Sequence, residues 1–265
     1  MFFLTIKQGD NMLPFKKVSK IYFSPSGTTK RIVDEIAKNF ELNNENYDLL
    51  SFDDSKDFVN ELVIVGMPVF DGRIPKLAKD RLSDFKGKNT KAIAVVNYGG
   101  LDYGDALLEL VDLLKENGFE VIGATSTVSR HSLFNEIASK RPDNLDMKML
   151  NEFSQNLIEK LESGKTNEIF VSGQKPFVEY VDHSFNVNCN EDLCVYCNDC
   201  VYTCPVDAIE EDNPIETNLD LCDSCSLCIN VCSENARSFD GENYFAEKAD
   251  ALENDMSRKE IEFFM

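Results

Sequence analysis

Apolar and polar positions alternate along the first 165 residues with two distinct periods. Short runs rich in β-branched residues predict strands, and stretches with apolar residues three or four positions apart predict amphipathic helices. The predicted strands cover 18–24, 47–52, 61–66, 92–97 and 119–128, and the predicted helices cover 31–40, 106–117 and 145–161. Strands that alternate with helices predict an α/β fold with a doubly wound, five-stranded parallel sheet.

The first predicted strand runs into a loop that carries hydroxyl groups and a glycine. This loop consists of Ser24, Pro25, Ser26, Gly27, Thr28 and Thr29, and a predicted helix follows it. Hydroxyls and free backbone N–H groups that converge at a positive helix N-terminus form a cradle for a phosphate. The alternative is that a Ser or Thr only caps the helix. Lys30 does not stand in a Gly-Lys-Ser/Thr sequence, so we do not expect an ATP site.

Two further irregular loops follow the third and fourth predicted strands. Ligands of open α/β sheets bind beyond the carboxyl ends of the strands, so we expect these loops to contribute to the same site. The candidate contacts are Pro68, Val69, Phe70 and Asp71 in one loop and Asn97, Tyr98, Gly99 and Tyr103 in the other. For the aromatic residues, ordinary loop packing is an equally good interpretation. His131 follows the fifth strand, and we favour a surface or structural role for it over a place at the site mouth.

The segment 18–165 resembles flavodoxin. Residues 24–29 fit the flavodoxin phosphate loop, commonly written Thr/Ser-x-Thr-Gly-x-Thr. The resemblance implies that the chain binds FMN, with the phosphate in this loop and aromatic rings over the two faces of the flavin. The rings in those positions here are Phe70 on one side and Tyr98 or Tyr103 on the other. The resemblance also implies that the Asp71-Gly72 peptide flips beside the flavin N5.

Cysteines are confined to the C-terminal part of the chain. All nine lie between residues 189 and 232, and eight of them form two runs with the spacing C-x-x-C-x-x-C-x-x-x-C. The first run is Cys194, Cys197, Cys200 and Cys204, and the second run is Cys222, Cys225, Cys228 and Cys232. Every cysteine of the first run recurs 28 positions later, which indicates a duplicated metal-binding unit.

Three closely spaced thiolates followed by a fourth suit a cubane iron–sulfur cluster. Residues 185–240 resemble a bacterial two-cluster ferredoxin, in which the fourth cysteine of each run ligates the other cluster. The resemblance implies two [4Fe–4S] clusters, one on Cys194, Cys197, Cys200 and Cys232, and one on Cys222, Cys225, Cys228 and Cys204. Cys189 is left as a spare thiol.

Zinc sites and disulfides are the alternatives for these cysteines. Zinc sites usually need only paired Cys-x-x-Cys arms with a longer spacer between them. No secretory signal precedes the runs, which makes disulfides less favoured. Two positions also depart from the ferredoxin pattern, because Tyr196 and Ser224 stand where that family usually has Gly. Gly serves tight turns and close backbone approach, so we expect these departures to affect the reduction potential more than ligation.

The formal net charge of -20 makes nucleic acid and anionic membranes poor partners. Redox partner proteins with a basic docking surface are one expectation, and acidity that serves only solubility is the other. No apolar run is long enough to predict a membrane-spanning helix, and we expect a cytoplasmic protein.

Taken together, the chain resembles a fused flavodoxin–ferredoxin electron carrier. The expected parts are an N-terminal extension (1–17), a flavodoxin-like FMN domain (18–165), a linker (166–184), a small α+β two-cluster [4Fe–4S] domain (185–240) and a C-terminal tail with partly helical spacing (241–265). FMN exchanges one or two electrons and each cluster exchanges one, so we expect low-potential electron transfer to redox partners. The alternatives are an FMN-dependent reductase of a small organic acceptor and a redox-sensing or docking subunit of a larger complex.

Overall fold

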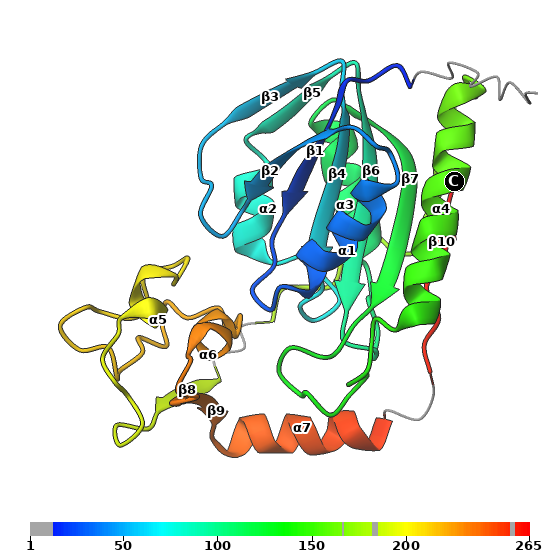
Figure 1. The fold of residues 1–265 in the computed structure, drawn as a ribbon. Coiled ribbons are helices and arrows are strands. Elements are labelled where there is room, and N and C mark those ends of the chain that lie inside the picture. Colours follow the sequence, from blue (N-terminus) through cyan, green and yellow to red (C-terminus); the bar gives the residue numbers. More distant parts are fainter. Residues whose placement is uncertain (1–12, 166, 182–184, 255–257) are drawn as a thin grey trace, which may run out of the picture.

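The computed structural model describes residues 13–165, 167–181, 185–254 and 258–265 (Figure 1). Most of the predicted N-terminal extension lies outside the described residues. The chain forms an α/β unit, a small cysteine-rich unit and a C-terminal segment that returns to the first unit. Within the described ranges, no helix is long and apolar enough to cross a membrane.

The central sheet has the order β10-β7-β6-β4-β1-β2. Its strands are β1 (Lys17–Tyr22), β2 (Asn43–Asp48), β4 (Leu62–Pro68), β6 (Thr90–Tyr98), β7 (Phe119–Val128) and β10 (Glu262–Phe264). The first five pair in parallel, and β10 pairs antiparallel with β7. Counted along the chain, the five parallel strands have the order 2-1-3-4-5, which is the flavodoxin-like arrangement. The predicted doubly wound fold is therefore confirmed.

Helices cover both faces of this sheet. Helices α1 (Thr28–Lys38) and α4 (Asn144–Glu162) bury apolar side chains in one cluster, and α2 (Lys76–Leu82) and α3 (Ala106–Glu116) bury theirs in the other. Spacing by three or four residues puts Ile32, Ile36 and Val33 of α1 on the sheet side, all fully buried. The central strand β4 is buried along nearly its whole length, as expected for a parallel strand covered on both faces.

The second strand differs from its prediction. We predicted a strand over 47–52, and the structure has β2 at Asn43–Asp48. The reason is that β2 is an edge strand with the polar sequence NNENYD, whereas Leu49 and Phe52 are apolar because they turn back into the core. The small sheet of β3 (Lys56–Val59) and β5 (Phe85–Lys88) was also not predicted.

The cysteine-rich unit is built around a two-stranded antiparallel sheet of β8 (Asn186–Cys189) and β9 (Arg237–Asp240). Between these strands, α5 (Asp199–Tyr202) and α6 (Leu227–Val231) begin within the two cysteine runs and contact each other. None of the nine cysteines forms a disulfide. After β9, the expected tail helix is present as α7 (Glu242–Asn254), and the chain then adds β10 to the central sheet.

The expected linker packs against the α/β unit instead of hanging free. We call its described part, residues 167–181, the strap. The guanidinium of Arg73 makes two hydrogen bonds of 2.7 Å to Glu109 of α3 and donates a further one to the carbonyl of Val178 in the strap. The guanidinium also lies 4.1 Å from the ring centroid of Tyr180. The Asp105 carboxylate accepts a hydrogen bond from the backbone N–H of Val178. The strap therefore has a fixed course over α3.

The ion pair of Arg73 and Glu109 is buried, with side chains that are only 7% and 1% exposed. Burial by itself raises the pKa of Glu109, but hydrogen bonds from Arg73 and Lys79 outweigh burial and hold that pKa below its ordinary value. A carboxylate with a lowered pKa stabilises the fold at neutral pH and loses this contribution as the pH falls through its folded-state pKa.

Replacing Glu109 by Gln should lower the free energy of unfolding of the α/β unit by about 3 kcal/mol, because a buried guanidinium loses its anionic partner. Urea unfolding measures this loss. The difference in free energy of unfolding between the wild type and the variant should become smaller in acid, where Glu109 is protonated. The control is Asp80→Asn, which removes an exposed ion pair with Lys76 and should change stability by no more than about 0.5 kcal/mol. Equal small losses in both variants would show that the buried pair does not hold the strap region together.

Candidate cofactor sites

The predicted phosphate loop joins β1 to α1 and has the geometry of an anion cradle. Gly27 adopts a left-handed backbone with φ of 75°, and its N–H donates to the Ser24 carbonyl at 3.0 Å. Ser24 Oγ accepts the N–H of Lys30 at 3.0 Å, and the Ser26 and Thr28 hydroxyls lie 2.9 Å apart. The first N–H groups of a helix have no intrahelical partner, so those that open α1 face the mouth of the loop.

Asn97 at the end of β6 makes hydrogen bonds to two hydroxyl groups of this loop. Its side-chain amide donates to Thr28 Oγ1 at 3.2 Å and to Thr29 Oγ1 at 3.4 Å. The Thr127 hydroxyl of β7 donates to the backbone carbonyl of Val96 at 2.9 Å and lies 3.3 Å from the side-chain oxygen Oδ1 of Asn97, so the amide NH2 of Asn97 faces the two threonines. The structure thus brings Asn97 to the phosphate loop, where it positions two hydroxyls.

The loop after β4 folds into a tight hairpin turn. Phe70 and Arg73 exchange two backbone hydrogen bonds of 2.9 and 3.0 Å, and the central residues Asp71 and Gly72 have φ of 49° and 76°. Two central residues with positive φ define the type I′ turn, for which Asp-Gly is a preferred sequence. An added Cβ on Gly104 would lie 2.7 Å from the Gly72 Cα, so the turn packs directly on the loop after β6.

A cavity of about 850 Å³ opens beside this turn. Its wall includes Val69, Phe70 and Asp71 of the turn, Leu101 after β6, His131 after β7, Tyr180 of the strap, Cys222, Asp223 and Ser224 of the second cysteine run, and Ala246, Glu247, Asp250, Ala251 and Asn254 of α7. In Figure 1, α7 runs across beneath the edge of the sheet at which β4 and β7 end. The cavity therefore joins the carboxyl ends of the strands to the second cysteine run.

Phe70 and Asp71 line this cavity as their prediction requires, whereas Tyr98 and Tyr103 do not. The two tyrosine rings pack against each other in the core at 5.5 Å, and the Tyr103 hydroxyl donates to Glu262 of β10 at 2.6 Å. Burial raises the pKa of Tyr98 to about 12. From that loop, Leu101 faces the cavity instead, so the structure gives no support to flavin contacts by the tyrosines.

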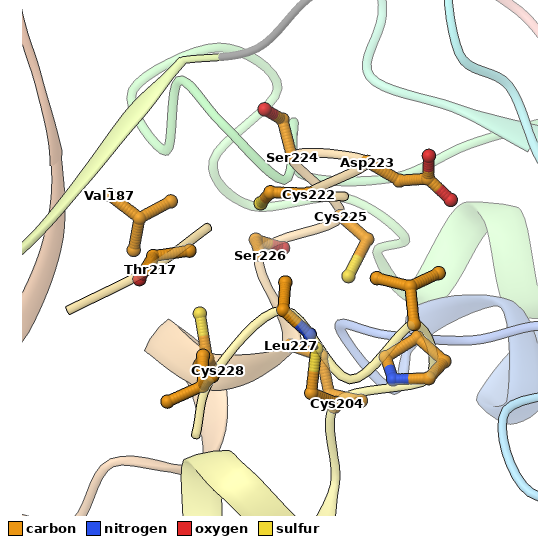
Figure 2. A pocket seen from close by; sticks show the side chains of 14 residues that line it. Val187, Cys204, Thr217, Cys222, Asp223, Ser224, Cys225, Ser226, Leu227 and Cys228 are labelled. Carbon is orange, nitrogen blue, oxygen red and sulfur yellow. Dashed lines mark hydrogen bonds between the residues drawn. The ribbon is translucent and has the colours of Figure 1, made fainter. Parts of the chain in front are cut away.

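The cysteines that the ferredoxin resemblance assigns to one cluster line a single pocket. Figure 2 shows Cys204 from the first run together with Cys222, Cys225 and Cys228 from the second. Chain crossing of this kind needs the first run to fold against the second, which the contact of α5 and α6 provides. Burial raises the pKa of the Cys225 and Cys228 thiols to about 12, so each thiol would lose a proton on binding iron.

The 28-residue repeat of the sequence reappears in hydrogen bonds to sulfur. The N–H of Ala208 donates to Cys204 Sγ at 3.3 Å, and the N–H of Ala236 donates to Cys232 Sγ at 3.2 Å. Donors of this kind stabilise the negative charge of a thiolate and tune the reduction potential of a cluster. The fourth cysteine of each run thus has the same environment.

The repeat also explains the positions at which ferredoxins usually have Gly. Tyr196 and Ser224 adopt left-handed backbones with φ of 55° and 50°, and Asn198 and Ser226 do so with φ of 63° and 69°. A left-handed backbone costs roughly 1–2 kcal/mol for a residue with a Cβ. The left-handed conformation that Gly would favour is therefore present in both runs, although Tyr196 and Ser224 occupy the Gly positions.

The other predicted ligand set, Cys194, Cys197, Cys200 and Cys232, is more open, and Cys197 is exposed. The spare Cys189 interacts with Cys194 and Cys200 of this set. Burial, and then these two cysteines, raise the pKa of Cys189 to about 11, against a lowering by Arg237. In the ranges that the structure describes, no group of three or more His, Cys, Asp or Glu side chains forms a ready metal-ion site. The thiolates of a cubane each bind a different iron.

Comparisons with known proteins support the description of the cysteine-rich half. The family model described as a 4Fe-4S binding domain matches residues 190–210. No curated protein matches. The chain resembles a flavodoxin–ferredoxin fusion. Its α/β half has the flavodoxin-like strand order, and its cysteine-rich half carries a 4Fe-4S binding segment. The matched segment covers the first cysteine run, which supports at least one [4Fe–4S] cluster.

Solved structures that resemble the chain include two bacterial flavodoxins. The flavodoxin of Streptococcus pneumonia TIGR4 shares 17% identity over 54% of this chain and 99% of its own, with a TM-score of 0.38. The flavodoxin of Fusobacterium nucleatum, solved with bound flavin mononucleotide, shares 14% identity over 55% and 99%, with a TM-score of 0.40. Rubredoxin oxygen:oxidoreductase of Desulfovibrio gigas shares 18% identity over 57%, with a TM-score of 0.41, and the match spans only 37% of its length.

Protein reconstituted under anaerobic conditions should contain about eight irons and eight acid-labile sulfides per chain, the sum of two cubanes. Cys225→Ser should reduce both counts to about four, because it removes a buried ligand of the second run. Cys189→Ser is the matched control and should keep the full count. Zinc without sulfide in the wild type would contradict the cluster assignment, and iron loss in the control would contradict the ligand sets.

Proposed function

We propose that the chain is an electron-transfer protein that passes low-potential electrons between two [4Fe–4S] clusters and FMN and on to redox partners. The observation that carries this proposal is the cavity shared by the turn at Phe70 and Asp71 and by the second cysteine run. Bound clusters supply one-electron chemistry and FMN supplies one- and two-electron chemistry. The proposed domains are 18–165 for FMN and 185–240 for the clusters.

The residues present fit an FMN phosphate. The loop from Ser24 to Thr29 offers hydroxyls and the free N–H groups of the α1 N-terminus, and the positive end of the helix dipole favours an anion there. A glycine at position 27 has the left-handed backbone that the loop requires, and an added Cβ there would meet nothing within 4 Å, so the loop mouth is open. The isoalloxazine ring would lie in the cavity lined by Phe70 and Leu101, whose wall includes no residue of 24–29.

The second cysteine set lies next to the cavity in which we place the flavin ring. Cys222 lines both the pocket of its set and the large cavity, whereas no described cysteine of the other set lines that cavity. Arg81 of α2 donates to the carbonyl of Pro205 at 3.2 Å, directly after the ligand Cys204. A cluster bound to the second set would therefore lie at the wall of the proposed flavin cavity.

The first cysteine set lies on the outer side and offers a surface for a partner. Large apolar side chains are exposed around it, namely Leu193 (48%), Val195 (61%), Tyr196 (51%) and Tyr202 (69%). The chain as a whole carries a net charge of -20. An apolar centre within an acidic protein suits a redox protein with a basic docking face, since complementary charge speeds encounter.

The cavity also favours a second candidate function. Its volume of about 850 Å³ lies within the range of small-molecule sites, roughly 300–1,000 Å³. An FMN-dependent reductase of a small organic acceptor, supplied with electrons by its own clusters, would need a cavity of this kind beside the flavin. Turnover of such an acceptor by the reduced protein distinguishes this function from a carrier.

Gly27→Glu should abolish FMN binding while both clusters are retained, because a carboxylate would occupy the place of the phosphate. FMN, iron and sulfide per chain measure the outcome. Gly164→Glu is the matched control, since Gly164 also has a left-handed backbone, with φ of 65°, and an added Cβ there likewise meets nothing within 4 Å. Unchanged flavin content in Gly27→Glu, or equal loss in both variants, would contradict the assigned phosphate site.

Cys225→Ser should slow the reduction of bound FMN by an external low-potential donor by at least about tenfold, because the ligand set beside the flavin cavity is incomplete. FMN should still bind, since its proposed contacts lie in the other domain. Rapid-mixing absorbance at the flavin bands compares this variant with the wild type and with Cys189→Ser. Equal rates in all three proteins, with the cluster shown to be absent from Cys225→Ser, would rule out this cluster as the relay.

A further inference from the structure

His131 is the one imidazole among the described residues, and it lines the large cavity. It stands just beyond the carboxyl end of β7 and lies against Gly99 of the loop after β6. The sequence favoured a surface or structural role for it. The structure gives it a defined tautomer and a packed ring at the wall of the cavity.

The tautomer follows from hydrogen bonds to Nδ1. The backbone N–H groups of Leu133 and Phe134 both donate to the His131 Nδ1 at 3.2 Å. A nitrogen that accepts two hydrogen bonds carries no proton, so the proton of the neutral imidazole is on Nε2. Burial lowers the pKa of His131 to about 4, which keeps the ring neutral at physiological pH.

The ring orientation is fixed by packing on two sides. One face stacks on Phe134, with ring centroids 4.7 Å apart. The Cδ2 edge lies against Gly99, where an added Cβ would come within 2.3 Å of that carbon, so the position tolerates only glycine. Within the described residues no hydrogen bond is made by Nε2, and this N–H is the remaining polar group of the ring.

We propose that His131 donates its Nε2–H to an acceptor atom of the flavin ring, which makes it a binding residue for the isoalloxazine. This inference rests on the FMN site proposed above. The ring of a flavin placed beside the turn at Phe70 and Asp71 shares one cavity with His131. Flavin carbonyl oxygens and unprotonated ring nitrogens accept hydrogen bonds, and a neutral, pre-oriented donor binds them at little entropic cost.

Two variants separate this role from a structural one. In His131→Asn, the side-chain oxygen takes the place of Nδ1 and still accepts the N–H groups of the next residues, but nothing reaches the place of Nε2. In His131→Gln, the amide N–H reaches the place of Nε2, and the acceptor for the loop is lost. If His131 is a flavin ligand, the Asn variant should bind flavin more weakly than the Gln variant. If its role is purely structural, the Gln variant should bind flavin more weakly than the Asn variant.

The experiment is a fluorescence titration of the full-length chain, clusters intact and flavin removed, with FMN and separately with riboflavin. His131→Asn should bind both about tenfold more weakly than the wild type, and its melting temperature should fall no further than that of His131→Gln, because both variants lose the stacked ring. His131→Gln should bind both within about threefold of the wild type. Riboflavin lacks the phosphate, so an equal factor for both flavins places the lost contact at the ring.

An Asn variant that binds both flavins as tightly as the wild type would overturn the inference and leave the FMN site intact. A Gln variant with the larger defect would overturn it also, because it would show that the loop contact is what matters. A wild-type chain that binds neither flavin would instead contradict the proposed function itself. The three results are distinct, so failure of the inference cannot be mistaken for failure of the FMN site.

Discussion

The guanidinium of Arg73 connects three parts of the molecule on which the arrangement of the sites depends. Arg73 ends the tight turn beside the cavity, pairs with Glu109 of α3, and donates to the carbonyl of Val178 in the strap. A buried arginine needs a full set of acceptors, since a charge that is left unpaired in a low-dielectric interior is strongly unfavourable. The geometry that satisfies this one side chain thus sets the turn, the helix and the course of the strap together.

A fixed strap has a direct consequence for the two sites. The strap leads into the cysteine-rich unit, and the second cysteine run meets the cavity wall opposite the turn at Phe70. Arg81 adds a second attachment at Pro205, and α7 and β10 return the chain to the far edge of the sheet. The described contacts thus attach the cysteine-rich unit to the α/β unit at more than one point. Cys222 of the second run lines the cavity beside the turn, whereas Cys197 of the first run is exposed.

Much of this architecture is predictable because it rests on periodic signals. Buried parallel strands such as β4 are continuous apolar runs, and the repeated cysteine spacing marks the candidate metal ligands without any knowledge of the fold. The bounds of the edge strand β2 were not predicted because its residues are polar. Strand β10 was not predicted because three residues give no usable pattern. The sequence also did not indicate that α7 forms a wall of the cavity, because that position depends on contacts with segments far away in the chain.

The details of the site were harder to predict, because they depend on contacts between residues far apart in sequence. From the sequence, flavin contact by Tyr98 or Tyr103 and ordinary loop packing were equally good interpretations. In the structure, Tyr103 pairs with Glu262 of β10 and both rings lie in the core. His131 looked unremarkable, and only its two N–H donors and its contact with Gly99 show a fixed imidazole in the cavity wall. A lone histidine after a strand has no sequence signal that would distinguish these roles.

The central claim is that the two sites of one chain work together as a unit. Flash photoreduction of the clusters, followed at the flavin absorbance bands over a range of protein concentrations, tests it most directly. Transfer within one chain predicts a rate constant for flavin reduction that does not change with protein concentration, because the second site is already in place. A rate that rises in proportion to protein concentration would show that electrons pass between chains, and it would contradict the account.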